Sequence, residues 1–202
     1  MPLTFKLNSE KTFAHSMKIQ EFQKSDVSKV KLFCDINIGK DYYSEKELED
    51  NQQRSEKNGI VTSFILVDEQ DENKIHGLRL CYPPGQWDQG KGKKLSPELW
   101  GHELADLGYF QSLFLSAEVQ GRGWGPQVSD RAIEALRALQ ARAVLTHCWK
   151  ESPGNSSFKY LNKIGFKTLK EHQDYWINVD YVCTRDGFPC RCTAIEMILE
   201  LK

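Results

Sequence analysis

The sequence predicts an α/β or α+β domain in which helices flank a single mixed β-sheet. An apolar segment over 108–119 leads through a glycine-rich turn into an amphipathic helix over 125–142. A second apolar strand over 143–149 follows that helix, as in a strand–helix–strand unit. A β-rich hairpin over 60–82 precedes the unit. Together these patterns predict helices packed around a sheet of parallel and antiparallel strands.

The chain has 202 residues, so we expect one domain over 1–202, with its core at about 16–200. Lys and Arg number 27 against 28 Asp and Glu, and this balance argues against a nucleic-acid-binding protein. The one basic cluster, KGKK at 91–94, is interpreted as a solvated loop. Because no run of 18 apolar residues and no signal-peptide pattern occurs, we expect a cytoplasmic chain without membrane contact.

The elements are predicted in chain order. HSMKIQEF alternates like a first strand over 15–22, and helices follow over 25–37 and 44–58, with serine N-caps. Two β-rich runs about a DEQDEN turn form the hairpin. Residues 83–107 hold prolines, glycines and two tryptophans, which indicate a long loop.

The second half of the chain alternates strands and helices. The helix over 125–142 has one apolar stripe, made of Trp124, Val128, Ala132, Leu136 and Leu139. A helix over 152–166 ends at Gly165. The remaining segments look like strands: 166–172, 174–184 and 192–201.

The segment SAEVQGRGWGPQVSD, residues 116–130, carries three glycines in five positions between a strand and a helix. The first amides of a helix have no intrahelical partner, and glycines let an oxyanion approach them. Pro126 suits the first helical turn. The turn therefore predicts a phosphate or pyrophosphate ligand. No Walker lysine follows it, and the G-x-G-x-x-G spacing of dinucleotide-binding proteins is absent.

Gln120-Gly121-Arg122-Gly123-Trp124-Gly125 instead resembles Q/R-x-x-G-x-G/A, the pyrophosphate loop of the GCN5-related N-acetyltransferase (GNAT) superfamily. The preceding strand end, Leu115-Ser116-Ala117-Glu118, corresponds to that family's V-x-P-E. NSSFKYLNKIGFK resembles the family's next helix and the GF that enters the following strand. The resemblance covers about 16–200, with its motifs concentrated in 108–171.

The resemblance implies that acetyl-CoA is the cosubstrate and that the chain is an acetyl-CoA-dependent N-acetyltransferase. The amides of Gln120 to Gly125 would hold the pyrophosphate, with Arg122 toward solvent or an outer phosphate and Trp124 in the core. Main-chain groups near Phe114 and Leu115 would pair with the pantetheine arm. In the family, an Asn lies near the start of the next helix and a Tyr within that helix contacts the departing coenzyme thiolate. Asn155 and Tyr160 each stand one residue from those positions. Asn155 is accordingly assigned to the coenzyme site, with a simple helix N-cap as the alternative, and the alternative for Tyr160 is a core residue.

An amine acceptor also needs a general base. The candidates are Asp106, Glu118, His102, Glu103 and His147. Of these, Glu118 and Asp106 are assigned to catalysis together with Tyr160. Glu118 could alternatively shape the turn, and His147 could be a core histidine. Glu103 and Asp106 are three apart and could bind a cationic amine, which favours a small cationic acceptor over a protein N-terminus.

Two further groups of residues, one of cysteines and one of aromatic residues, each allow two interpretations. Cys183, Cys190 and Cys192 flank an RDGF turn and could bind zinc with His172, but C-x₆-C-x-C lacks the usual knuckle spacing, so no metal is assigned. The aromatic residues of this region could line the acceptor pocket or only pack: Tyr175, Trp176, Tyr181 and Phe188.

The predicted function is thus transfer of an acetyl group to a primary amine by direct attack on the thioester. Three alternatives stay open: a non-catalytic acyl-CoA sensor of the same fold, a protein N-acetyltransferase, and an unrelated enzyme that binds ATP. The sequence leaves the oligomeric state open, a homodimer included.

Overall fold

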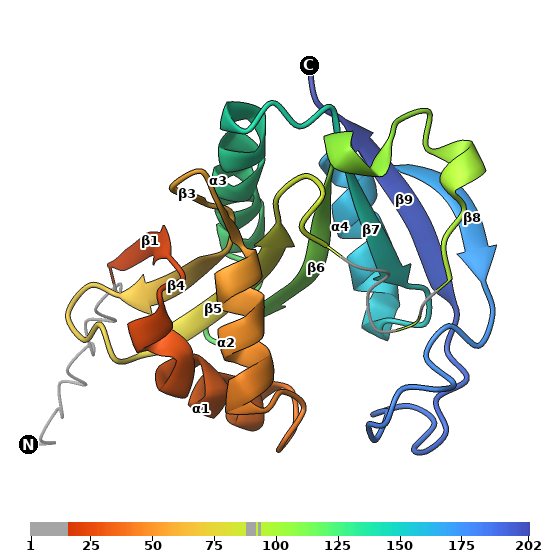
Figure 1. The fold of residues 1–202 in the computed structure, drawn as a ribbon. Helices are drawn as coiled ribbons and strands as arrows, with labels where there is room; N and C mark the ends of the chain where they lie inside the picture. Colours follow the sequence, from red (N-terminus) through yellow and green to blue (C-terminus); the bar gives the residue numbers. More distant parts are fainter. Residues whose placement is uncertain (1–15, 88–91, 93) are drawn as a thin grey trace, which may run out of the picture.

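A seven-stranded sheet forms the centre of the molecule (Figure 1). The computed structural model describes residues 16–87, 92 and 94–202. Lys91 and Lys93 of the KGKK cluster and residue 15 of the first predicted strand lie outside them. The sheet order is β1-β4-β5-β6-β7-β9-β8. Its strands are β1 (Met17–Glu21), β4 (Phe64–Asp68), β5 (Ile75–Tyr82), β6 (Leu107–Leu115), β7 (Ala143–Trp149), β8 (Lys167–His172) and β9 (Ala194–Glu200).

One strand pair in the sheet is parallel, and the others are antiparallel. β6 and β7 run parallel because α3 (Trp124–Ala138) crosses over between them. The predicted mixed sheet and its strand–helix–strand unit are therefore confirmed. A separate two-stranded hairpin, β2 (Glu56–Lys57) with β3 (Ile60–Val61), turns at Asn58 and Gly59, which both have positive φ.

Helices cover both faces of the sheet. On one face lie α1 (Val27–Asn37) and α2 (Glu45–Arg54), followed along the sheet by the described residues of 94–107 (Figure 1). On the other face lie α3 and α4 (Ser156–Lys163). Ser44 caps α2 as predicted: its hydroxyl accepts from the Glu47 amide, and the Glu47 carboxylate accepts from the Ser44 amide. Four 3₁₀ turns complete the described structure: η1 (Lys24–Asp26), η2 (Pro97–Leu99), η3 (Leu104–Asp106) and η4 (Pro153–Asn155).

The core divides between these two faces, as strand alternation requires. The α3–α4 face buries Leu66, Phe110, Val128 and Leu136 in one cluster. The opposite face buries Ile65, Leu78 and Phe33 beneath α1 and α2, and Trp87, Trp100 and Leu145 beneath the 83–107 segment. Two-sided burial explains why β5 is inaccessible along its whole length.

The structure shortens several predicted elements and removes one. The strand predicted over 108–119 ends at Leu115, and the helix predicted over 125–142 ends at Ala138. The helix predicted over 44–58 ends at Arg54. The strand predicted over 174–184 is wrong: this segment consists of turns, with one isolated bridge between Cys183 and Gly187. β9 already pairs with β7 on one edge and β8 on the other, so it offers no edge to a further strand.

β6 and β7 separate halfway along β6. Their pairing runs from Leu107 with Ala143 to Phe110 with Thr146 and stops there. Beyond that point β6 stays paired with β5 as far as Leu115, while β7 stays paired with β9 as far as Trp149. The second half of β6 therefore presents one backbone edge to an opening between the two strands, which we call the splay.

Candidate functional site

The glycine-rich turn lies where β6 ends and α3 begins, next to the splay. Gly121 and Gly123 have φ of 73° and 84°, and Gly123 occupies the N-cap of α3. A Cβ atom at either position would meet nothing within 4 Å. Their requirement is therefore conformational, since side chains other than glycine pay about 1–2 kcal/mol in this region. Open space above both glycines also leaves their amides accessible.

Four peptide groups in this turn have no backbone acceptor among the described residues. They are the amides of Gly121, Gly123, Trp124 and Gly125. The first two are exposed, and the last two begin a 15-residue helix whose dipole adds partial positive charge. This arrangement can bind an anion such as a phosphate group.

Other residues of the turn shape it. The Gln120 side chain donates to the Leu115 carbonyl at 2.8 Å, and Gln127 donates to the Gly123 carbonyl at 3.2 Å. Arg122 is exposed, and Trp124 packs against the core, as its place on the apolar stripe predicts. Gly125 is buried, and a Cβ there would lie 3.5–3.6 Å from Leu113, Leu115 and Tyr160. Gly121 and Gly123 thus meet a conformational requirement, whereas a Cβ at Gly125 would make only ordinary van der Waals contacts.

Glu118 points away from the amides of the turn, toward the start of β5. Its carboxylate lies 3.0 Å from the Lys74 ammonium and 3.6 Å from Nδ1 of His76. The same imidazole nitrogen lies 3.1 Å from the Ser116 hydroxyl. These contacts join the strand end to β5, which is the turn-shaping alternative foreseen for this residue.

The edge of β6 that faces the splay contains both residues predicted to bind the coenzyme arm. Phe114 and Leu115 are half-buried, with side chains on opposite faces of the sheet. Phe114 packs edge-on against Tyr42, and Leu115 packs with the α3 cluster. Because no strand pairs with this edge beyond Phe110, an extended ligand could add to it.

Tyr160 reaches from α4 to the first turn of α3. Its hydroxyl donates to the Ser129 hydroxyl at 2.5 Å and lies 3.1 Å from the Gly125 carbonyl. Leu161, the position that the family pattern selects, is buried in the core instead. The one-residue offset along α4 therefore brings Tyr160 toward the glycine turn.

Arg79 completes this polar cluster from β5. Its side chain is 3% exposed, and it donates to Ser129 Oγ at 2.7 and 3.1 Å, to the Ser112 carbonyl at 3.3 Å and to Tyr160 at 3.5 Å. It also lies 4.1 Å above the Phe110 ring. Burial lowers its pKa, but guanidinium keeps its charge at neutral pH. No carboxylate pairs with it among the described residues, so Arg79 adds a positive charge that no carboxylate neutralises on this side of β5.

Sequence reasoning missed Arg79. The available signal was a single charged residue inside an otherwise apolar strand, IHGLRLCY. A charge at such a position is expensive to bury and therefore often has a function.

Asn155 precedes α4 in a left-handed conformation, with φ of 55°. Its side chain makes no cap hydrogen bond, and Ser152 Oγ accepts from the Ser157 amide instead. Asn155 therefore occupies the N-cap position of α4, as expected, but its side chain makes no capping hydrogen bond. Asn155 is exposed at the end of the helix that also supplies Tyr160.

A second polar cluster lies on the opposite face, at the last paired residues of β6 and β7. Nδ1 of His147 is 2.9 Å from the Tyr109 hydroxyl, and Nε2 is 3.0 Å from the Lys94 carbonyl. Burial lowers the pKa of His147 to about 4, so the ring is neutral at physiological pH. Burial raises the pKa of Tyr109. A neutral imidazole beside a phenol can accept and relay a proton.

His172 and Glu196 lie next to His147 but bond to each other. Nε2 of His172 is 2.7 Å from Glu196, whose other carboxylate oxygen accepts from Trp100 at 2.7 Å and from the Ser96 amide at 3.2 Å. Burial raises the pKa of Glu196, but these donors outweigh it and leave the pKa below its ordinary value. Tyr175 stacks on His147 with ring centroids 4.6 Å apart.

The acidic residues of the 83–107 segment do not join this cluster. Asp106 precedes β6, at the end of that strand opposite the glycine turn, and its backbone carbonyl accepts from the Arg142 amide at 2.9 Å. The Asp106 carboxylate lies 4.0 Å from the Arg142 guanidinium. His102 pairs with Glu200 at 2.8 Å. The structure therefore does not bring Asp106 together with Glu118 or Tyr160.

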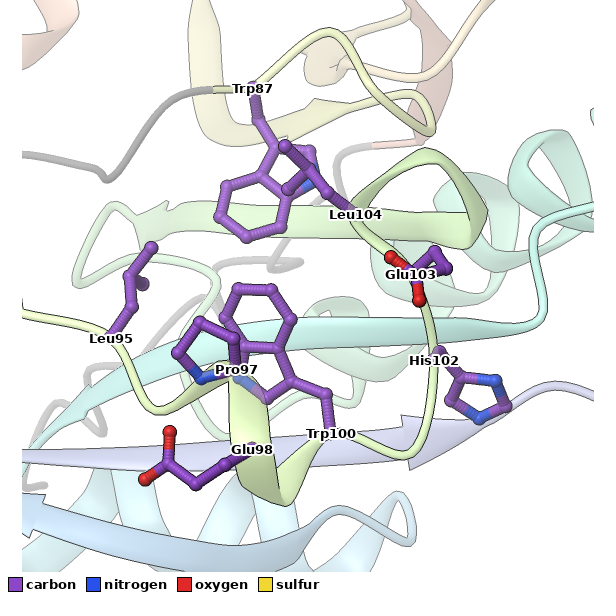
Figure 2. Close-up of a pocket in the computed structure, with 8 residues that line it drawn as sticks. All are labelled: Trp87, Leu95, Pro97, Glu98, Trp100, His102, Glu103 and Leu104. Carbon is purple, nitrogen blue, oxygen red and sulfur yellow. The ribbon is translucent and has the colours of Figure 1, made fainter.

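The described residues of the 83–107 segment line a cavity of their own, with a volume of about 500 Å³. Figure 2 shows Trp87 and Trp100 on either side of it, with Leu95 and Pro97 beside them and His102 turned away. Trp87 donates to the Leu107 carbonyl at 2.7 Å, which fixes the cavity at the start of β6. The cavity thus lies away from both the splay and the glycine turn.

The cysteines at the end of the chain gather, but not around His172. The ligand atoms of Cys183, Asp186, Cys190 and Cys192 all lie within 4.8 Å of one another. Of the aromatic residues expected near an acceptor, Tyr175 contacts His147 and Tyr181 contacts Tyr42, whereas Phe188 is 65% exposed. Trp176 packs edge-on against Tyr175.

Comparison with known proteins identifies solved structures with a similar fold. No protein-family model and no curated protein matches the chain. Solved structures do. The Escherichia coli ribosomal-protein-S18-alanine N-acetyltransferase has a TM-score of 0.63 and 14% identity over 93% of this chain and 95% of that one. Arabidopsis thaliana Naa50, in complex with the bisubstrate analogue CoA-Ac-MVNAL, has a TM-score of 0.62 and 13% identity over 92% and 99%.

A chimeric spermidine N-acetyltransferase from Vibrio cholerae is also similar, with a TM-score of 0.58 and 14% identity over 91% and 95% of the two chains. An acetyltransferase described as of the GNAT family, from Streptococcus pneumoniae, covers 93% of this chain. The chain therefore has the GNAT fold, as its turn and strand order predicted. Among the described residues, no helix has the length and apolar character to span a membrane.

Proposed function

We propose that this chain is an acetyl-CoA-dependent N-acetyltransferase of the GNAT superfamily. One observation carries the proposal: four unpaired amides lie at the end of a strand that has just separated from its neighbour. The amides suit a pyrophosphate, and the free strand edge suits an extended amide-containing arm. CoA contains both groups in one molecule. ATP offers phosphates but no such arm, so the geometry favours CoA.

In this proposal the coenzyme lies on the α3–α4 face. Gly121, Gly123, Trp124 and Gly125 hold the pyrophosphate through their amides, with Gln120 and Arg122 at the rim of the same turn. Phe114 and Leu115 pair with the arm through their backbone groups. Asn155 stands at the exposed end of α4, toward the coenzyme. Tyr160 then lies beside the departing sulfur, where its hydroxyl donates a proton or a hydrogen bond to the thiolate.

The acceptor amine enters from the opposite face. Its proton passes to the Tyr109 oxygen while the Tyr109 hydroxyl proton moves to Nδ1 of His147, because Nε2 of His147 already donates to the Lys94 carbonyl. The imidazole is neutral, hydrogen-bonded to Tyr109 and next to the point where β6 and β7 separate. The amine nitrogen attacks the thioester carbonyl, a tetrahedral intermediate forms, and the sulfur leaves as a thiol. The chain orients both reactants and manages two protons on separate faces.

The acceptor is proposed as a primary amine. The small cationic amine favoured by the sequence rested on Glu103 and Asp106, and the Asp106 carboxylate lies near Arg142 instead. The names of proteins with a similar fold point to both small amines and peptides. One is a spermidine N-acetyltransferase, and another is in complex with the bisubstrate analogue CoA-Ac-MVNAL. A useful acceptor panel therefore contains polyamines, amino acids and peptides with free N-termini.

The sensor alternative rested on the offset of Tyr160 by one residue along its helix. Because the Tyr160 hydroxyl reaches the first turn of α3, that offset no longer favours a non-catalytic module.

The decisive experiment combines coenzyme binding with turnover. We expect acetyl-CoA to raise the melting temperature, ATP to leave it unchanged, and one or more amines of the panel to release free CoA thiol. Gly123→Val should abolish coenzyme binding, because its side chain would cover the amides. Gly59→Val is the matched control, since Gly59 also has positive φ and open space but lies in the β2–β3 hairpin. Equal coenzyme affinity of the two variants would refute the assigned turn, and stabilisation by ATP alone would refute the function.

A further inference from the structure

The segment between β8 and β9 is held together by its side chains. Residues 173–193 contain turns and one isolated bridge between Cys183 and Gly187. Nevertheless, Cys183, Cys190 and Cys192 are only 5%, 0% and 1% exposed. A segment with so little backbone pairing needs another source of order, because fixing each residue costs about 1–2 kcal/mol.

The three sulfurs and one carboxylate have the spacing of a metal site. Sγ of Cys183 lies 3.7 Å from Sγ of Cys192, and the Cys192 sulfur lies 3.3 Å from Oδ2 of Asp186. Tetrahedral zinc with Zn–S bonds of about 2.3 Å places its sulfurs roughly 3.8 Å apart. A disulfide would instead bring two sulfurs to about 2.05 Å. The spacing therefore matches coordination better than a covalent bond.

A hydrogen-bond donor lies beside one of these sulfurs, as donors do around bound thiolates. The Tyr181 hydroxyl donates to the Cys190 sulfur at 3.2 Å. This contact suits a thiolate at Cys190.

We propose that Cys183, Asp186, Cys190 and Cys192 bind one zinc ion. Three thiolates and a carboxylate form a closed four-ligand set, so the site is structural and lacks the open position of a catalytic zinc. The side chain of Asp186 is 23% exposed, whereas the cysteines are buried, so the ion enters past the carboxylate.

His172 is not the fourth ligand, contrary to the set considered from the sequence. It belongs to a different group with His147 and Glu196, whose ligand atoms also lie within 4.8 Å of one another. In that group both ring nitrogens of His147 have partners, and Nε2 of His172 bonds to Glu196 at 2.7 Å. Hydrogen bonds within the protein therefore already satisfy the histidine group. In the cysteine group, by contrast, thiol groups, which are weak hydrogen-bond donors, face one another.

The ion orders a segment that packs toward the splay. Tyr181 lies between the cysteine cluster and Tyr42, with ring centroids of the two tyrosines 5.8 Å apart. Tyr42 in turn packs against Phe114 on the free edge of β6 at 5.9 Å. Zinc bound at Cys190 thus fixes Tyr181 and, through Tyr42, one side of the opening between β6 and β7.

Metal content tests the site directly. The full chain, purified in a reducing buffer without chelators, should contain about one zinc per molecule by elemental analysis, with the matching mass in native mass spectrometry. Cys183→Ser and Cys190→Ser should lose the metal. Cys34→Ala is the matched control, since Cys34 is also buried and unbonded to another sulfur, and it should keep the full content.

Two milder variants keep the test informative if a cysteine variant fails to fold. Asp186→Asn should lower the affinity for zinc, measured in competition with a chromophoric chelator. Tyr181→Phe should lower that affinity by about tenfold, because it removes the hydroxyl that donates to the Cys190 sulfur. Substituting Co²⁺ should give the visible absorption of tetrahedral cobalt thiolate. A wild-type chain that takes up no zinc when zinc is supplied overturns the proposal. So does a mass two daltons low that indicates a disulfide, or zinc affinity unaffected by Asp186→Asn.

Discussion

The two faces of the sheet supply opposite chemistry to the same opening. On the α3–α4 face, Arg79, Ser129 and Tyr160 form a cluster of donors beside four unpaired amides. On the other face, His147 is neutral and lies beside Glu196, the carboxylate of a histidine–glutamate pair. The first face suits an anion and a departing thiolate, and the second suits a proton that leaves an amine. In the proposed reaction, this division would let one strand gap hold two reactants that need opposite electrostatics.

Among the variants that test this contrast between the faces, the largest loss of kcat is expected at His147. His147→Gln should lower kcat by about 100-fold to 10,000-fold, the usual contribution of a general base, and should leave the affinity for acetyl-CoA unchanged. His102→Gln is the comparison, because His102 pairs with Glu200 away from the splay and should retain activity. Steady-state thiol release measures both. If His147→Gln and wild type have similar kcat, the general base does not lie on this face of the sheet.

A smaller effect is expected on the coenzyme face. Tyr160→Phe should lower kcat by about tenfold to a hundredfold, less than the loss of the base, because a thiolate of pKa about 8–9 leaves without full protonation. Ser129→Ala removes the hydrogen-bond partner and keeps the phenol, so it separates positioning from proton donation. If Ser129→Ala loses as much kcat as Tyr160→Phe, then Tyr160 acts only through its place in the cluster.

The pH dependence of stability sharpens the contrast between the faces. The pKa of His147 falls from about 6.5 in the unfolded chain to about 4 in the folded one, so the unfolded chain binds more protons between these values. The free energy of unfolding should therefore decrease as the pH drops from about 6.5 to about 4. The lowered pKa of Glu196 acts in the same direction below its ordinary value. Urea denaturation of wild type and His147→Gln should give a steeper acid loss for wild type.

The smallest effects belong to the two carboxylates first assigned to catalysis. Glu118 is 61% exposed and pairs with Lys74, so Glu118→Gln should change stability by less than about 1 kcal/mol and kcat very little. Asp106→Asn should behave alike, because Asp106 lies at the far end of β6. Thiol release and thermal melts measure both variants. A hundredfold loss of kcat in either one would mean that the acceptor approaches from a different side.

More of the proposed coenzyme site than of the proposed acceptor site could be predicted from the sequence. The glycine turn, the apolar strand and the stripe of α3 are all local patterns, so Gly121, Gly123 and Trp124 could be placed from the sequence alone. His147 could be named but not given a role, because its pKa depends on burial by residues about 50 positions away, such as Lys94. Arg79 was not found, because a strand pattern does not reveal which helix its charged residue meets.

Local periodicity and turn chemistry thus determined the mixed sheet, the crossover helix and the glycine turn proposed to bind an anion. These depend on backbone preferences and side-chain alternation over a few residues. Only the tertiary structure decided which side chains share a face of the splay: Tyr160 with Ser129 and Arg79, His147 with Tyr109, and Asp186 with the three cysteines. Such groupings form where strands and loops distant in the chain pack together, so they depend on packing that no short stretch of sequence encodes.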